Sequence, residues 1–360
     1  MNTFFELVQI AIGVRESLSE IPACREEWDR LFKVVGDHSL LGVTFPVIDR
    51  LHDEVEVPLG IYSRWAMVAE KISKRNAAQV KMCKSLYEKF LANGFRCCVL
   101  KGQGAALRYP DPSLRHSGDI DLWMEGDRQK VVDYMRSLCP IRKIVYHHLD
   151  AELIPKMGVE IHFTPSWMNA PSANRRLQRW FESEAEGQWS NYDAGLGFCV
   201  TTAPFDAVFM LIHIYRHVLE EGIGLRQLLD YYYVLRQLNP EQRDKVKTDL
   251  RKLEMDRFAA AVMYVMQQVF AMDEGLCLFA PDEKEGRFLL DEVMRSGNFG
   301  KHDPRNAHAK GETLVAHGKR KFGRGIRYMF HYPSEVLWMA PFMTWQYFWR
   351  RRHGYLYKGR

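Results

Sequence analysis

The chain has 360 residues, of which 47% are hydrophobic and 26% charged, a balance typical of a folded globular protein. The formal net charge of +5 does not by itself indicate nucleic-acid binding, and no run of about 18 apolar residues predicts a membrane span. The seven cysteines are odd in number and form no CxxC pair, so neither a disulfide framework nor a zinc site is indicated. The first residues do not resemble a signal peptide, and we expect a cytoplasmic protein.

The first part of the chain, residues 1–93, is predicted to be helical. Apolar residues recur at helical spacing around 4–12, 26–35 and 62–91. Asn93-Gly94 ends the last of these helices.

The next part, residues 94–170, has the pattern of a small mixed sheet. The predicted strands are 95–100, 119–124, 141–149 and 158–163. The predicted helices are a short one around 105–109, which Pro110 ends, and one from 127 to about 138 that Asp127 caps.

The remaining chain is predicted to be helical again, most clearly at 205–219, 225–238 and 257–270, with a polar loop at 297–311. We therefore expect an α+β protein in which a small mixed-sheet core is embedded in a mostly helical chain. The expected parts are an N-terminal helical region (1–93), the α/β core (94–170), a helical domain (171–300), and a loop with an aromatic and basic C-terminal segment (301–360).

Two aspartates, Asp119 and Asp121, stand two positions apart in an apolar run. In a strand both side chains point the same way, and two like charges side by side require a positive partner. A divalent cation, Mg²⁺ or Mn²⁺, fits this pair. Glu160 is isolated in the apolar run GVEIHF and is the expected third ligand, or the base for an acceptor hydroxyl. The alternatives are a solvated strand end for the aspartates and a surface position for Glu160.

A glycine turn, Gly102-Gln103-Gly104, follows a predicted strand and opens a helix. Backbone N–H groups at such a turn favour a phosphate, and Lys101 and Arg115 would add positive charge. The four cofactor-binding candidates are therefore Lys101, Gly102, Gly104 and Arg115, and each has a simpler structural explanation. The glycines permit a tight turn, and the cations balance the acidic residues.

These parts resemble the polymerase-beta-type nucleotidyltransferase superfamily. More narrowly, LKGQGAALRYPDPSLRHSGDIDLWM, from Leu100 to Met124, resembles an uncharacterised bacterial nucleotidyltransferase-like family that reads LKG, then YPDP, then DIDL. The segment HIYRHVLEEGIGLRQLLDYYYVL is similar to a helical part of that family, and the resemblance covers about residues 20–350. It implies a nucleotidyltransferase fold, Mg²⁺, an NTP substrate, and family roles for Gly102, Gly104, Asp119 and Asp121. The turn departs from the family's usual Gly-Ser or Gly-Gly.

The helical part carries four polar residues that would line the acceptor side: His213, His217, Arg226 and Asp230. The two histidines are four residues apart and share a helix face. The alternative, which we favour, is a polar network that holds two helices together. His147, His148 and His162 are read as surface or packed histidines.

The C-terminal segment combines aromatic residues with Arg350, Arg351 and Arg352. It would suit an anionic membrane surface or stacking on bases, but we favour a terminal helix that packs Trp338, Phe342, Trp345 and Trp349 onto the body. Pro341 is expected to kink this helix or to start a second one, and Glu335 argues against a membrane.

The sequence thus predicts a Mg²⁺-dependent nucleotidyltransferase that moves an NMP from an NTP to a hydroxyl or phosphate and releases pyrophosphate. A small-molecule acceptor is favoured over nucleic acid. The alternative is a nucleotide-binding or partner-binding module of the same fold without turnover.

Overall fold

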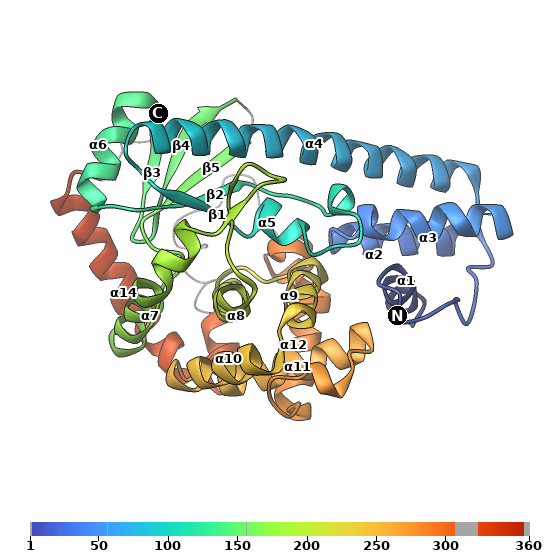
Figure 1. The fold of residues 1–360 in the computed structure, drawn as a ribbon. Helices are drawn as coiled ribbons and strands as arrows, with labels where there is room; N and C mark the ends of the chain where they lie inside the picture. Colours follow the sequence, from blue (N-terminus) through green and yellow to red (C-terminus); the bar gives the residue numbers. More distant parts are fainter. Residues whose placement is uncertain (1, 56, 156, 307–322, 356–360) are drawn as a thin grey trace.

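A computed structural model describes residues 2–55, 57–155, 157–306 and 323–355 of the chain. The fold is α+β, as predicted: one five-stranded sheet is surrounded by helices (Figure 1). The N-terminal helices are α1 (Asn2–Ala11), α2 (Arg25–Asp37), α3 (Leu41–Glu54) and α4 (Leu59–Ala92). Helix α4 extends from α2 and α3 across to the sheet, and its buried side chains Trp65 and Phe90 belong to the common hydrophobic core.

The sheet has the strand order β1-β2-β5-β4-β3. The strands are β1 (Cys97–Leu100), β2 (Ile120–Met124), β3 (Ile141–Ile144), β4 (His148–Ile154) and β5 (Met157–His162). Strands β2 and β5 are parallel neighbours, and all other pairs are antiparallel. Cys97 and Cys98 are buried and free, as their place in an apolar strand predicted.

Two predictions in this region were wrong in detail. Residues 141–149 are not one strand, because the chain turns between β3 and β4, where the Val145 N–H donates to the His148 carbonyl at 2.9 Å. The short helix is α5 (Gly102–Ala106), so the glycine turn lies inside its first turn and not before it. Helix α6 (Arg128–Leu138) begins as predicted, with the Asp127 carboxylate accepting from the Gln129 N–H.

The helical half after the sheet contains all three helices that the periodicity predicted, with two short strands. Its elements are α7 (Pro171–Trp189), β6 (Tyr192–Asp193), β7 (Phe198–Cys199), α8 (Ala203–Glu220), α9 (Leu225–Gln237), α10 (Pro240–Lys252), α11 (Asp256–Phe270), η2 (Glu274–Leu276), α12 (Glu283–Ser296), η3 (Asn298–Gly300), η4 (Pro304–Asn306) and α14 (Pro333–Arg352). A further helix covers 323–329. Residues 307–311 of the predicted loop lie outside the described residues.

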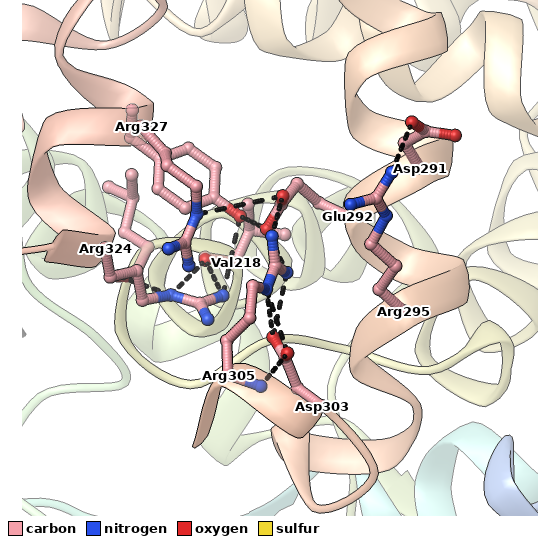
Figure 2. A network of polar contacts seen from close by, with 10 residues as sticks. Val218, Asp291, Glu292, Arg295, Asp303, Arg305, Arg324 and Arg327 are labelled. Carbon is pink, nitrogen blue, oxygen red and sulfur yellow. Dashed lines mark hydrogen bonds and ion pairs between the residues drawn. The ribbon is translucent and has the colours of Figure 1, made fainter. Parts of the chain in front are cut away.

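A polar network joins α12 to the helix at 323–329 (Figure 2). Arg305 contacts the Glu292 carboxylate at 2.7 and 2.9 Å and also binds Asp303. Arg324 donates to the Val218 carbonyl at 2.6 Å, near the C-terminal end of α8, where carbonyl groups lack helical partners. These contacts fix the segments on both sides of 307–322 to the helical body.

Helix α14 is one continuous helix with Pro341 inside it, so the alternative that a second helix starts at Pro341 was wrong. The aromatic stripe packs only in part. Phe342 and Trp345 lie against Tyr146, but Trp338 and Trp345 are 44% and 46% exposed. Glu335 does not face solvent. It is buried, and its Oε2 contacts Arg216 at 2.9 Å and accepts from the Asn169 N–H. In the described parts of the chain, no helix has both the length and the apolar character that a bilayer crossing requires.

His38 joins the N-terminal helices to α9 and should make stability depend on pH. It is 1% exposed, and its Nδ1 accepts from the Leu225 N–H at 3.2 Å. Burial lowers the pKa of His38 to about 4, helped by His302 and opposed by Asp37. Between about pH 6.5 and pH 4, His38 therefore carries a proton in the unfolded chain but not in the native protein.

Between pH 6.5 and pH 4, His38 should therefore cost up to about 3 kcal/mol of unfolding free energy. Urea unfolding at several pH values would measure this. Because other histidines titrate in the same range, the result that matters is the difference from a His38→Gln variant. Gln keeps a hydrogen-bond acceptor but does not titrate, so equal pH slopes in the two proteins would contradict the assignment.

Candidate active site

A cavity of about 640 Å³ lies between the sheet and helices α8, α9 and α14. This volume is in the range of small-molecule sites. Its wall contains most of the candidate residues: Lys101, Gly102, Arg115, Asp119, Asp121, Glu160, His213, His217, Arg226 and Asp230. Residues that are up to 129 positions apart in the sequence thus line the same cavity. Of the candidate residues, Gly104 does not line it.

The three carboxylates lie side by side at one end of the cavity. Asp121 on β2 is in register with Glu160 on β5. The His162 Nε2 is 3.1 Å from Asp121 Oδ1 and 3.3 Å from Glu160 Oε2. Asp119 directly precedes β2 and lies against Gly158, where an added Cβ would be 2.6 Å from the Asp119 carboxylate. Only glycine at position 158 allows Asp119 this place next to the other two.

The two aspartates respond differently to this environment. Burial, and then repulsion from Asp121 and Glu160, raises the pKa of Asp119. Burial would raise the pKa of Asp121 as well, but Lys101 and the hydrogen bond from His162 together hold it well below its usual value. The protein thus stabilises the ionised form of Asp121 and destabilises that of Asp119, as expected for a cluster that lacks one positive charge.

This contrast predicts opposite effects on stability. At pH 7 without divalent metal, Asp119→Asn should raise the melting temperature because it removes repulsion, whereas Asp121→Asn should lower it because Lys101 and His162 lose their partner. Differential scanning calorimetry of both variants at the same pH would measure the two shifts. Shifts of the same sign would contradict the electrostatic description.

Lys101 connects the carboxylates to the helical half. Its Nζ is 3.4 Å from Asp121 Oδ2 and 3.4 Å from His213 Nε2 on α8. Its backbone has φ of 53°, which is uncommon for a residue with a side chain and is typical of functional sites. Gly102 also lines the cavity, but Gly104 packs against Val200, where an added Cβ would be 3.1 Å away. Gly104 therefore serves the packing of α5.

Arg115 is committed to another carboxylate. Its Nε and Nη2 donate to the two oxygens of Asp230 at 2.6 and 2.8 Å, and Tyr109 donates to Asp230 at 2.7 Å. Arg226 lies 3.5 Å from the same carboxylate. Burial would raise the pKa of Asp230, but the two arginines keep it below its usual value. The guanidinium group of Arg115, which we expected to bind a phosphate, thus binds Asp230 on α9. Its Nη1 makes no hydrogen bond within the described residues.

His213 and His217 are adjacent on the cavity wall, with ring centres 4.3 Å apart. Burial, and then the charge of Lys101, lowers the pKa of His217 to about 3 and that of His213 well below its usual value. Both rings are therefore neutral at physiological pH. They bring hydrogen-bonding capacity to this wall without adding charge.

Several residues that shape the site were not singled out from the sequence. The side chains of Asn76 and Gln79 on α4 donate to the carbonyls of Arg115 and Gly118, and Gln103 donates to both of these side chains. They hold the loop that leads into Asp119. His148 and His162 were read as surface or packed histidines, but both line the cavity next to Glu160. The alternation in Glu-Ile-His, which places Glu160 and His162 on one strand face, was the available signal.

A family model described as an uncharacterised nucleotidyltransferase matches residues 25–271, more than half of the chain. No curated protein gives a significant match. The matched region contains the whole sheet and every residue discussed above from Lys101 to Asp230. On this match the chain belongs to the uncharacterised nucleotidyltransferase family, as the LKG, YPDP and DIDL motifs indicated.

Proposed function

We propose that the protein transfers a nucleoside monophosphate from an NTP to a hydroxyl or phosphate of a small-molecule acceptor, with release of pyrophosphate. The observation that supports this most is the placement of Asp119, Asp121 and Glu160 together on the wall of one cavity of about 640 Å³. Three carboxylates within a shared space match the oxygen ligands that Mg²⁺ prefers.

The fit of a divalent cation rests on the charges of the site. Burial, and then repulsion from Asp121 and Glu160, raises the pKa of Asp119 although Lys101 is close by, and a further positive charge would relieve the repulsion. Asp119 and Asp121 would hold Mg²⁺, and Glu160 would complete the set. When bound, Mg²⁺ would neutralise charge on the phosphate oxygens and help to orient the α-phosphate.

The protein's own groups would then position the reactants. The Lys101 ammonium and the Gly102 backbone N–H would contact the β- and γ-phosphates, which is consistent with both residues lining the cavity. The acceptor oxygen would form a bond to the α-phosphorus as the bond to pyrophosphate breaks. The proton of an acceptor hydroxyl would pass to Glu160. His213 and His217, which are neutral and line the same cavity, would provide hydrogen bonds to the acceptor.

The experiment that tests this function starts from α-labelled NTPs. Each labelled NTP is incubated with the protein, Mg²⁺ or Mn²⁺, and a cell extract separated into metabolite, RNA and protein fractions. We expect label in the metabolite fraction together with release of pyrophosphate. Label in another fraction would change the acceptor class. NTP binding without transfer to any fraction would favour the alternative, a nucleotide-binding module without turnover.

A further inference from the structure

A second cluster of ligand atoms lies next to the aspartate pair. Among the described residues, the group that brings three metal-ligating atoms within 4.8 Å of one another is His148, Glu160 and His162. They come from the neighbouring strands β4 and β5, where His148 is in register with His162. From these residues we propose that the protein has a site for a transition-metal ion of the Zn²⁺ type, which lies beside the Mg²⁺ position at Asp119 and Asp121 and shares Glu160 with it. This proposal does not depend on nucleotidyl transfer.

The spacing of the ligand atoms matches a tetrahedral site. Glu160 Oε2 is 3.3 Å from His162 Nε2 and 3.5 Å from His148 Nδ1. In a tetrahedral zinc site with bonds of 2.0–2.1 Å, neighbouring ligand atoms are about 3.3 Å apart. The fourth position of such a site would be open to water or to a ligand. Two imidazoles and a carboxylate suit Zn²⁺ or a similar ion better than Mg²⁺, which prefers oxygen ligands and octahedral geometry.

His148 has the surroundings of a metal ligand. Its side chain is about nine-tenths buried, and its Nδ1 makes no hydrogen bond within the described residues although it is directed at Glu160. Its other nitrogen, Nε2, is 2.9 Å from Asp150 Oδ1. Asp150 Oδ1 does not have the alignment of a hydrogen bond within the described residues, but its negative charge beside Nε2 favours the proton there and leaves Nδ1 free to bind a metal.

Binding of Co²⁺, which has a strong visible spectrum when tetrahedral, tests the proposal without an activity assay. The full-length protein, treated with a chelator and dialysed, is titrated with Co²⁺. We expect one tetrahedral Co²⁺ per chain, displaced by one equivalent of Zn²⁺ and retained in a roughly thousand-fold excess of Mg²⁺. Zn²⁺ should also raise the melting temperature.

The variants separate this site from a general effect of losing histidines. A His148→Ala/His162→Ala variant should bind Co²⁺ at least about 100-fold more weakly, and Asp150→Asn about 10- to 100-fold more weakly. His217→Gln removes another histidine that lines the same cavity, and this variant should bind Co²⁺ as the wild type does. Circular dichroism confirms that each variant is folded.

Two results would overturn the proposal. One is a wild-type spectrum of six-coordinate Co²⁺ or no binding at all. The other is equal affinity in the wild type and in a folded Asp150→Asn or double-histidine variant. Neither result would affect label transfer with Mg²⁺ at Asp119 and Asp121, so the two proposals fail separately.

Discussion

An Asp119→Asn/Asp121→Asn variant should lose transfer of label from the NTP by about a thousand-fold or more. Both substitutions keep the shape of the side chain and remove its charge, so the cavity should keep its volume but no longer hold Mg²⁺ against the phosphates. A loss of this size corresponds to about 4 kcal/mol of transition-state stabilisation, which is within the range that a metal ion supplies. The measurement is the initial rate of label transfer to the fraction that accepts it.

The control for this variant is Asp133→Asn, which removes an exposed carboxylate of α6 far from the cavity and should leave the rate unchanged. Melting curves of all three proteins show whether the fold is intact. Label transfer within about ten-fold of the wild-type rate by a folded double variant would refute a catalytic role for the aspartate pair.

Asp230→Ala should lower the free energy of unfolding by about 3–5 kcal/mol, because it leaves Arg115 and Arg226 buried without their carboxylate. Asp230 accepts two hydrogen bonds from Arg115 and one from Tyr109, and the Arg115 side chain is 2% exposed. Denaturant unfolding monitored by circular dichroism would measure the loss. This prediction concerns stability only and holds whether or not the protein is an enzyme.

Two further variants make the test specific to the buried pair. Arg287→Ala breaks an ion pair with Glu283 in which both side chains are more than 60% exposed, and it should leave the free energy of unfolding nearly unchanged. An Arg115→Met/Asp230→Leu variant removes Asp230 together with one of its two arginines and should recover part of the loss, because only Arg226 then lacks its carboxylate. A small effect of Asp230→Ala, similar to that of Arg287→Ala, would contradict the prediction. It would show that water replaces the lost carboxylate as the hydrogen-bond partner of the buried arginines.

The sequence by itself determined the local features. Helical periodicity identified α4, α8, α9 and α11, and the alternation of apolar residues identified the strands that carry Asp121 and Glu160. These patterns arise from the fixed repeats of helices and strands, so they are readable without tertiary contacts. The LKG, YPDP and DIDL motifs also indicated the family that the family model shows.

Only the tertiary structure decided which groups meet. Arg115 was expected to contact a phosphate, but its partner is Asp230, which is 115 residues away. Nothing in the sequence around Arg115 indicates this pairing. Glu335 was read as a charge at the start of the C-terminal segment that argues against a membrane, but its partner is the buried Arg216, 119 residues away. His148 and His162 became candidate ligands only because β4 and β5 pair in a register that places them beside Glu160. Burial and charge pairing depend on contacts between distant segments, and the periodicity of a single segment does not encode its partners.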